Sequence, residues 1–231
     1  MVPEKRNSPV VVFGAGGRAG LAVVAEALRR GRPVLGVVRD PARHSEISAL
    51  GDDVTVVAGD LTDSDSVAAV LAGVSGEVAA LVNAVAPFPG PPESFDGFDP
   101  EHYVRLVENL VRGARGARLI EIGLAATLRT GSGRMFEDPA VFPAFLRPFA
   151  EARMKSLAAW REQPAEVDWL VVTPPPALSL EAPATGEYRI GGDVLDAQTA
   201  SIPLSYADLA TAILDQIDQP TISRQQVSVY R

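Results

Sequence analysis

The strongest constraint on the fold is a glycine-rich turn near the start of the chain, between an apolar run and a helical pattern. Residues 10–13 are apolar and mostly β-branched, residues 14–20 are rich in glycine, and residues 21–28 have helical spacing. A strand, a tight turn and a helix N-terminus in this order form the setting that binds the pyrophosphate of a dinucleotide. The sequence therefore predicts a dinucleotide-binding turn, with a glycine turn of an unrelated α/β fold as the alternative.

Two glycine patterns fit this turn, and both begin at Gly14. One is G-x-G-x-x-A and the other is G-x-x-G-x-x-G, and each places free N–H groups at the same helix end. Gly14 is expected to let the chain turn sharply, and Gly17 to let backbone approach phosphate oxygens. The predicted cofactor contacts in the turn are Gly14, Gly16, Gly17, Arg18 and Ala19.

Apolar runs and helical patterns alternate along most of the chain. The alternation predicts an α/β fold, a Rossmann-type doubly wound parallel sheet with right-handed crossovers. We expect one NAD(P)-binding domain over residues 1–231, in which the proline- and glycine-rich residues from about 174 to 204 form a small C-terminal substrate lobe. The predicted strands are 10–13, 34–38, 54–58, 78–85, 118–122, 168–172 and 226–230, and the predicted helices are 21–28, 42–50, 67–71, 101–115 and 207–217.

Composition excludes several classes of function. The net charge of −8 argues against nucleic acid as a partner, because phosphate binding needs concentrated Lys and Arg. The absence of cysteine excludes disulfides and thiol chemistry, and it fits a cytoplasmic protein. Only His44 and His102 supply imidazoles, and their spacing to Glu does not resemble a zinc site, so we expect no metal. No apolar run is long enough for a membrane helix, so we expect no membrane partner.

The end of the second predicted strand carries arginines where an NAD-selective site usually carries a carboxylate. Arg39 is the first residue after this strand, and Arg43 follows four positions later. Arginine binds phosphate oxygens in pairs, so the two side chains suit the 2′-phosphate of NADP(H). Asp40 is the complication, since it could still reach a ribose hydroxyl. The alternative is that both arginines are ordinary solvated charges.

Other cofactor contacts are expected after the next strands, because ligands of such sheets bind at the carboxyl ends. Asp60 and Leu61 are expected at the adenine, although Asp60 could simply cap the next helix. At the end of the fourth strand, the expected cofactor contacts are Asn83, Ala84 and Val85. Small residues there allow the close approach of a flat ligand, although they would equally suit tight packing.

The position after residues 118–122 is where a hydride-transfer enzyme would carry a hydroxyl, and only Thr127 offers one there. Further on, Glu151 and Lys155 lie four residues apart on a predicted helix and therefore on one face. They could form an ordinary surface ion pair, or Lys155 could reach the nicotinamide ribose. Glu151 could deliver a proton if burial raises its pKa.

Taken together, several short motifs resemble the short-chain dehydrogenase/reductase superfamily, in its atypical NAD(P)H-binding branch. That branch includes biliverdin reductase B-like flavin reductases and NmrA-like proteins. The resemblance covers nearly the whole chain. It rests on Gly14-Ala15-Gly16-Gly17-Arg18-Ala19-Gly20, Val38-Arg39-Asp40-Pro41-Ala42-Arg43, Gly59-Asp60-Leu61-Thr62-Asp63, Leu119-Ile120-Glu121-Ile122-Gly123, Asp168-Trp169-Leu170 with Pro174, Gly186-Glu187-Tyr188-Arg189-Ile190-Gly191-Gly192 and Ser205-Tyr206-Ala207-Asp208-Leu209-Ala210.

The resemblance implies roles for particular residues. It assigns the pyrophosphate to the glycine turn, the 2′-phosphate to Arg39 and Arg43, and the cofactor ribose to Lys155. Gly123 and Pro174 are expected to line the cofactor site at their strand ends. The chain departs from the family pattern at the usual catalytic tyrosine, whose place falls on Glu151, and at the usual serine, which alanines replace.

The leading hypothesis is therefore an NADPH-dependent reductase of a small quinone, flavin or enone, an atypical oxidoreductase without the usual Tyr/Ser pair, with Lys155 and Glu151 as its candidate catalytic residues. Alternatives are an isomerase, epimerase or dehydratase on the same scaffold, or a non-catalytic NADP(H) sensor. We expect a small-molecule substrate and a monomer or homodimer. Seven phenylalanines suggest an apolar pocket, or equally core packing, at Phe88, Phe95, Phe98, Phe136, Phe142, Phe145 and Phe149.

Overall fold

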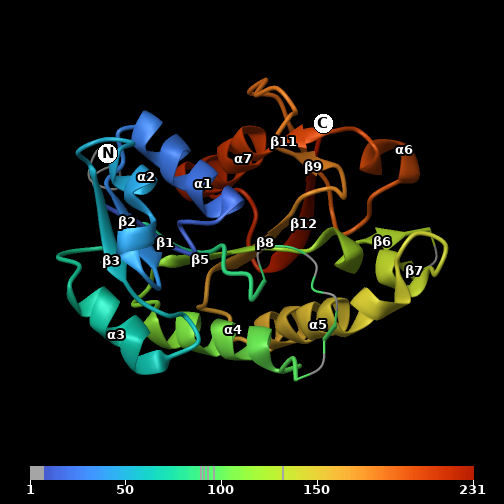
Figure 1. Ribbon diagram of the computed structural model, residues 1–231, viewed down its shortest axis with the longest axis horizontal. Helices are drawn as coiled ribbons and strands as arrows, with labels where there is room; N and C mark the ends of the chain where they lie inside the picture. The colour runs from blue at the N-terminus through green and yellow to red at the C-terminus, as the bar shows by residue number, and fades with distance from the viewer. Residues whose placement is uncertain (1–7, 89, 91, 93, 96, 132) are drawn as a thin grey trace.

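A mainly parallel sheet forms the centre of the molecule. The computed structural model describes residues 8–231 except 89, 91, 93, 96 and 132. Within the described residues, eight strands follow the order β10-β12-β8-β5-β4-β1-β2-β3, and all neighbours are parallel except β10 and β12 (Figure 1). The strands are β1 Val10–Phe13, β2 Val34–Val38, β3 Val54–Ala58, β4 Ala80–Asn83, β5 Arg118–Ile122, β8 Trp169–Thr173, β10 Arg189–Ile190 and β12 Gln225–Tyr230. This arrangement confirms the predicted Rossmann-type α/β fold.

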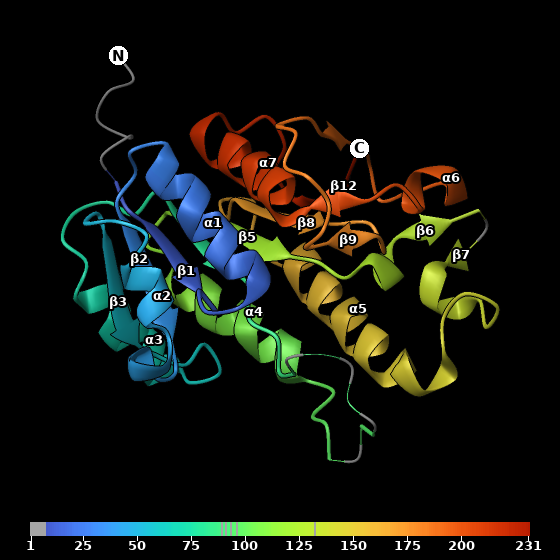
Figure 2. The same cartoon turned by 45° about the horizontal axis from the view of Figure 1, so that its top comes forward.

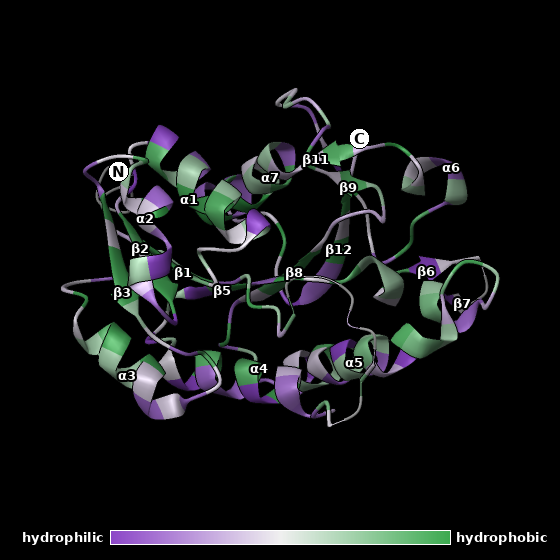
Figure 3. Ribbon diagram, viewed as in Figure 1, coloured by the Kyte–Doolittle hydropathy of each residue, from purple (hydrophilic) through white to green (hydrophobic). Residues whose placement is uncertain are grey.

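Helices cover both faces of the sheet. Figures 1 and 2 show α1, α2 and α7 on one face and α3, α4 and α5 on the other. The helices are α1 Arg18–Arg29, α2 Ser45–Ser48, α3 Ser64–Ala72, α4 His102–Gly113, α5 Arg147–Arg161, α6 Ala197–Ala200 and α7 Tyr206–Asp218. Hydrophobic and hydrophilic residues alternate along α1 and α4 in Figure 3, as in amphipathic helices that bury one face.

Two apolar cores lie on the two faces of the sheet, because successive side chains of a strand point to opposite sides. Val10 and Val12 of β1 pack in the core under α1 and α7. Val11 and Phe13 of the same strand pack in the core over α3, α4 and α5. This second core contains Trp160 and Trp169, whose rings stack with centroids 5.7 Å apart.

The chain departs from regular alternation after β5. Short 3₁₀ turns at Ala125–Thr127, Met135–Glu137 and Ala144–Leu146 precede α5. The remaining short strands pair in two small sheets, β6 Arg129–Thr130 with β7 Gly133–Arg134, and β9 Leu178–Ser179 with β11 Leu204–Ser205. Among the described helices, none has both the length and the apolar character needed to cross a membrane.

Candidate functional site

A cleft of about 970 Å³ lies at the carboxyl ends of the central strands. The strand order reverses between β1 and β4, which is where open α/β sheets bind their ligands. The cleft is lined by every predicted cofactor contact except Asn83 and Lys155, that is by Gly14, Gly16, Gly17, Arg18, Ala19, Arg39, Arg43, Asp60, Leu61, Ala84, Val85, Gly123 and Pro174.

A second cavity, of about 500 Å³, lies at the opposite edge of the sheet. Two of its arginines are bound to carboxylates of the fold itself: Arg118 donates to Asp168 at 2.6 Å, and Arg32 pairs with Asp218 at 2.5 Å. The amino ends of parallel strands are not the usual ligand edge, so the first cleft is the candidate site.

The glycine turn has no room for side chains at two of its positions. Gly14 has a positive φ of 81°, and a Cβ there would lie 2.7 Å from the carbonyl oxygen of Ala84. A Cβ on Gly20 would collide with the carbonyl oxygen of Gly14. This close packing places the first turn of α1, which begins after Gly17, directly at the cleft. Its first amides have no intrahelical acceptor and suit an anion.

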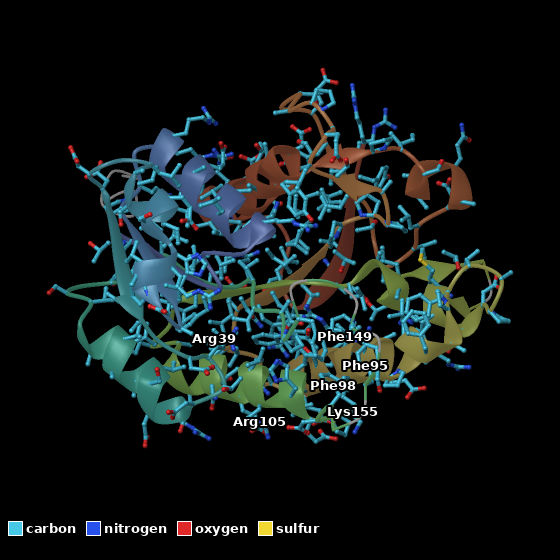
Figure 4. All side chains as sticks on the ribbon, in the orientation of Figure 1. Arg39, Phe95, Phe98, Arg105, Phe149 and Lys155 are labelled. Carbon is cyan, nitrogen blue, oxygen red and sulfur yellow. The ribbon has the colours of Figure 1, made fainter. Side chains whose placement is uncertain are left out.

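The arginines after β2 are both exposed and both line the cleft. Asp40, between them, accepts a hydrogen bond from the backbone N–H of Ala42 at 3.1 Å and so caps the short 3₁₀ turn Pro41–Arg43. The carboxylate that complicated the choice of nucleotide therefore has a structural partner. Figure 4 shows Arg39 between the two helical layers of the molecule.

Asp60 also lines the cleft, and it does not cap α3. Its carboxylate accepts from the backbone N–H of Thr62 at 2.8 Å and from the hydroxyl of Thr62 at 2.7 Å. The N-cap of α3 is Asp63 instead, which accepts from the N–H of Asp65 at 2.9 Å. The alternative interpretation of Asp60 as the helix cap is therefore wrong.

Asn83 is buried below the cleft rather than exposed in it. Its side-chain oxygen accepts from the backbone N–H of Val85 at 3.0 Å. Its amide nitrogen Nδ2 is buried and has no hydrogen-bond partner among the described residues. The Asn83 side chain therefore bonds to the loop that carries Ala84 and Val85 to the cleft, and Asn83 itself is not part of the described lining.

The structure places Lys155 and Glu151 outside the cleft, which corrects the expectation that they act there. Lys155 is half-exposed and pairs with Glu101, and in Figure 4 it lies on the outer side of α5. Glu151 is exposed and lies 4.0 Å from Arg147. Neither belongs to the described lining of the cleft. The cause is the phase of α5, whose inward face carries Ala152, Ser156 and Trp160 instead.

The cleft instead receives Arg153, which sequence reasoning missed. Arg153 lies about half a turn around α5 from Lys155, so it faces the sheet, where Nη1 donates to Glu121 at 2.8 Å. Its guanidinium carbon lies 3.8 Å from the centre of the Tyr103 ring. The apolar spacing of Ala152, Leu157 and Trp160 was the available signal, because it marks the inward face of the helix.

Three further lining residues were also not predicted as part of the site. His102 begins α4, Tyr206 begins α7, and His44 follows the short turn after β2. Burial lowers the pKa of the His102 imidazole, Arg153 lowers it further, and Asp60 opposes the shift.

Two other tyrosines, Tyr188 and Tyr103, are not part of the described lining of the cleft. Tyr188 donates to Asp215 at 2.5 Å, and burial raises its pKa strongly, with Asp215 adding to the shift. Tyr103 is buried beneath Arg153, and burial raises its pKa as well. Tyr206 is therefore the tyrosine that the described cleft contains.

Thr127 is not available as a catalytic hydroxyl. It is buried, and its hydroxyl donates to the carbonyl of Leu124 at 2.7 Å and accepts from the side chain of Gln226 at 2.7 Å. The residues that line the cleft after β5 are Gly123, Leu124 and Ala125, which offer only backbone polar groups.

The phenylalanines divide between the two expected roles. Phe88, Phe95, Phe98 and Phe149 form one aromatic group with centroids 5.6 to 6.2 Å apart, and Phe88 lines the cleft (Figure 4 labels the other three). Phe136 and Phe142 pack in a separate small core, and Phe145 is exposed.

Comparison with known proteins identifies the family. The model of a family described as NAD(P)H-binding matches residues 14–220. The chain therefore belongs to this NAD(P)H-binding family, which agrees with the resemblance to the atypical short-chain dehydrogenase/reductase branch.

Individual relatives share the fold at low sequence identity. The uncharacterized protein YwnB of Bacillus subtilis (strain 168) is 26% identical over 230 residues, which cover 94% of this chain and 96% of YwnB. A Streptococcus pneumoniae structure, proposed to be an NADH-flavin reductase, is 22% identical with a TM-score of 0.74, over 97% of this chain and 100% of that one. A Bacteroides thetaiotaomicron structure, proposed to be an epimerase, is 24% identical with a TM-score of 0.79, over 97% of each chain.

Proposed function

We propose that this protein is an NADPH-dependent reductase of a small organic molecule. The observation that carries the proposal is the cleft itself, where the glycine turn, the start of α1 and the arginines after β2 line one continuous surface. When bound, NADPH supplies the hydride, while the protein orients the reactants and excludes water. The pyrophosphate is assigned to Gly14, Gly16, Gly17, Arg18 and Ala19, and the adenosine half to Arg39, Arg43, Asp60 and Leu61.

The preference for NADPH over NADH is argued from charge. Arg39 and Arg43 are exposed at the cleft, and their planar groups suit the oxygens of a 2′-phosphate. Asp40, the carboxylate that would favour a free ribose hydroxyl, bonds to the N–H of Ala42 and is not part of the described lining of the cleft. Gly123 and Pro174 are assigned to the nicotinamide end of the cofactor, at the ends of β5 and β8.

The proposed substrates are quinones, flavins or enones, because aromatic residues stand at the cleft and planar conjugated molecules pack well on aromatic rings. The flavin-reductase name of the Streptococcus relative supports the same class. The protein is proposed to act in the cytoplasm as a monomer or homodimer, on a small molecule.

The test is a calorimetric titration of the purified protein with NADPH and NADH, beside an Arg39→Ala, Arg43→Ala double variant. We expect NADPH to bind about tenfold or more tightly than NADH, and the double variant to lose this preference while keeping NADH binding. Equal affinities in the intact protein would remove the NADPH assignment. Absence of binding by both nucleotides would contradict the proposed function.

A second candidate follows from the missing proton-transfer residues. The positions of the usual tyrosine and serine carry Glu151, which is exposed, and alanines. A nucleotide sensor needs no proton-transfer residue, and an isomerase, epimerase or dehydratase that keeps its nucleotide would use a carboxylate for proton transfer in place of the usual pair. The epimerase name of the Bacteroides relative belongs to the second of these classes. Net consumption of NADPH distinguishes the reductase from all of these alternatives.

A further inference from the structure

Four arginines line the cleft although the chain as a whole is acidic. The net charge of the protein is −8, yet the described lining contains Arg18, Arg39, Arg43 and Arg153 and a single carboxylate, Asp60. A cleft with this charge attracts anions. The proposed nucleotide contacts account for the first three arginines, and Arg153 on α5 is left for another ligand.

Arg153 is held in place by contacts on two sides. Its side chain is 10% exposed, Nη1 donates to Glu121 at 2.8 Å, and the guanidinium lies 3.8 Å from the centre of the Tyr103 ring. Its Nε is buried and has no hydrogen-bond partner in the part of the chain that the structure describes. The group is therefore positioned before any ligand arrives, and one of its donors is unused.

Glu121 explains why Arg153 stays at this position. The carboxylate is buried, and besides Arg153 it accepts from the hydroxyl of Ser156 at 2.9 Å and from the indole of Trp160 at 2.7 Å. Donors on three side chains of α5 thus fix one carboxylate of β5. These hydrogen bonds hold the Glu121 carboxylate in place, and the carboxylate in turn anchors the guanidinium.

His102 is, like Arg153, a polar side chain at the cleft with a buried nitrogen that is unpaired in the described structure. It lines the cleft, its ring meets the edge of Tyr103 with centroids 4.9 Å apart, and its Nε2 is buried with no hydrogen-bond partner among the described residues. The lowered pKa favours the neutral imidazole, in which one ring nitrogen carries the hydrogen, and a ligand oxygen at Nε2 would favour the tautomer in which Nε2 donates. A ligand oxygen within hydrogen-bond distance of Nε2 would supply the partner that this buried nitrogen lacks within the described part of the chain.

We propose that Arg153 and His102 recognise an ionised oxygen on the substrate, and that the substrate class is a planar conjugated carbonyl compound with such an oxygen, for example a hydroxyquinone. A guanidinium only donates hydrogen bonds, so its partner is an acceptor. The aromatic group that contains Phe88 and Phe98 gives the same end of the site a surface for a flat ring. The inference rests on the proposed reductase function, because it names the substrate of the same cleft.

The test compares two quinones on the protein saturated with NADP⁺, so that no reduction occurs. Lawsone, a hydroxynaphthoquinone, is an anion at neutral pH, and menadione is a neutral relative of the same size. The chain has no cysteine, so neither quinone meets a thiol. By calorimetry, we expect lawsone to bind about tenfold more tightly than menadione to the wild type. We expect the ratio to fall close to one in Arg153→Met, while NADP⁺ affinity stays within about twofold.

Two variants keep the test decisive if Arg153→Met does not fold, which its melting curve will show. Arg153→Lys keeps the charge and loses the planar fork, and His102→Asn removes the imidazole, so both are expected to lower the ratio by about threefold or more. Arg161→Gln removes an exposed arginine of the same helix and should match the wild type.

The two proposals fail in different ways. If the wild type does not bind NADP⁺, the reductase function itself is wrong. If NADP⁺ binds but the lawsone-to-menadione ratio is the same in the wild type, Arg153→Lys and His102→Asn, the recognition site is wrong and the reductase proposal stands. If Arg161→Gln lowered the lawsone-to-menadione ratio as much as Arg153→Lys and His102→Asn do, the proposed recognition site would also be wrong. The effect would then come from the total charge of the protein.

Discussion

Gly20 determines how closely the first helix approaches the first strand. A Cβ there would collide with the carbonyl oxygen of Gly14, and a backbone atom cannot rotate away as a side chain can. We expect Gly20→Ala to lower the free energy of unfolding by about 1–3 kcal/mol, despite the better helix propensity of alanine, and to weaken nucleotide binding.

Gly17→Ala is the matched control for this change. Its φ is −79°, and the nearest atom to an added Cβ is the same Gly14 oxygen at 3.4 Å. We expect it to cost less than about 1 kcal/mol, and urea denaturation of both variants measures the difference. If both variants lost the same free energy of unfolding, the close contact at Gly20 would not be the cause of the loss.

We expect the lowered pKa of His102 to make the free energy of unfolding depend on pH. Burial lowers its pKa in the folded protein, so the unfolded chain binds the proton more tightly. Stability is therefore complete above the unfolded pKa of about 6.5 and falls as the pH drops from there toward the folded value. Arg153 strengthens this effect and Asp60 weakens it.

The measurement is the difference in unfolding free energy between the wild type and His102→Asn at several pH values. We expect the wild type to lose stability relative to the variant as the pH falls below about 6.5. Carboxylates titrate in both proteins and cancel in the comparison. Parallel pH curves for the two proteins would contradict the buried, neutral imidazole.

Among the elements, α1 and α7 are joined by an ionic network centred on Arg30. This side chain is 15% exposed, and it donates to Glu26 at 2.7 Å, to Asp215 at 2.7 Å and to Asp218 at 2.8 Å. Arg29 also pairs with Glu26 at 2.6 Å, but its side chain is 68% exposed. The neighbouring arginines thus differ mainly in burial and in the number of partners.

We expect Arg30→Met to lower the free energy of unfolding by about 1–3 kcal/mol, because it leaves carboxylates of two helices without their common partner. Arg29→Met should cost less than about 1 kcal/mol, because water screens an exposed pair. Thermal and urea unfolding of the two variants test this order. If Arg29→Met lowered the free energy of unfolding more than Arg30→Met does, the ionic network around Arg30 would not be what joins α1 to α7.

The elements that the sequence predicted best are those whose pattern is local. The strand predicted at residues 118–122 is β5, Arg118–Ile122, and the helix predicted at 207–217 is α7, Tyr206–Asp218. In both, the apolar pattern lies within the element itself and needs no distant part of the chain to interpret it. The two-residue strands β9 and β11 were missed, because their pairing joins residues that lie far apart in the chain and leaves no periodic pattern.

At the site, the sequence predicted correctly which residues line the cleft where backbone position alone decides it. Gly14, Arg39 and Asp60 follow strands, and strand ends in such a sheet meet at one edge. It failed on α5, where the outcome depended on rotation of the helix. Lys155 was assigned from the family resemblance, although the apolar residues around it place Arg153 inward.

At the scale of the whole molecule, an acidic chain carries a cleft whose charged lining residues are arginines except for Asp60. The fold brings the turn after β1 and the arginine after β2 to the same cleft as Arg153 of α5, which lies more than a hundred residues further along the chain. Only the assembled sheet creates this concentration of positive charge, so composition alone could not reveal it.

Turnover of NADPH with a quinone, a flavin and an enone as acceptors tests the reductase function directly. We expect saturable consumption of NADPH matched by reduced acceptor, and we expect the rate with an ionised hydroxyquinone to fall strongly when Arg153 is replaced. Tight NADPH binding without consumption in the presence of any of these acceptors would contradict a reductase, and would favour the isomerase or sensor alternatives.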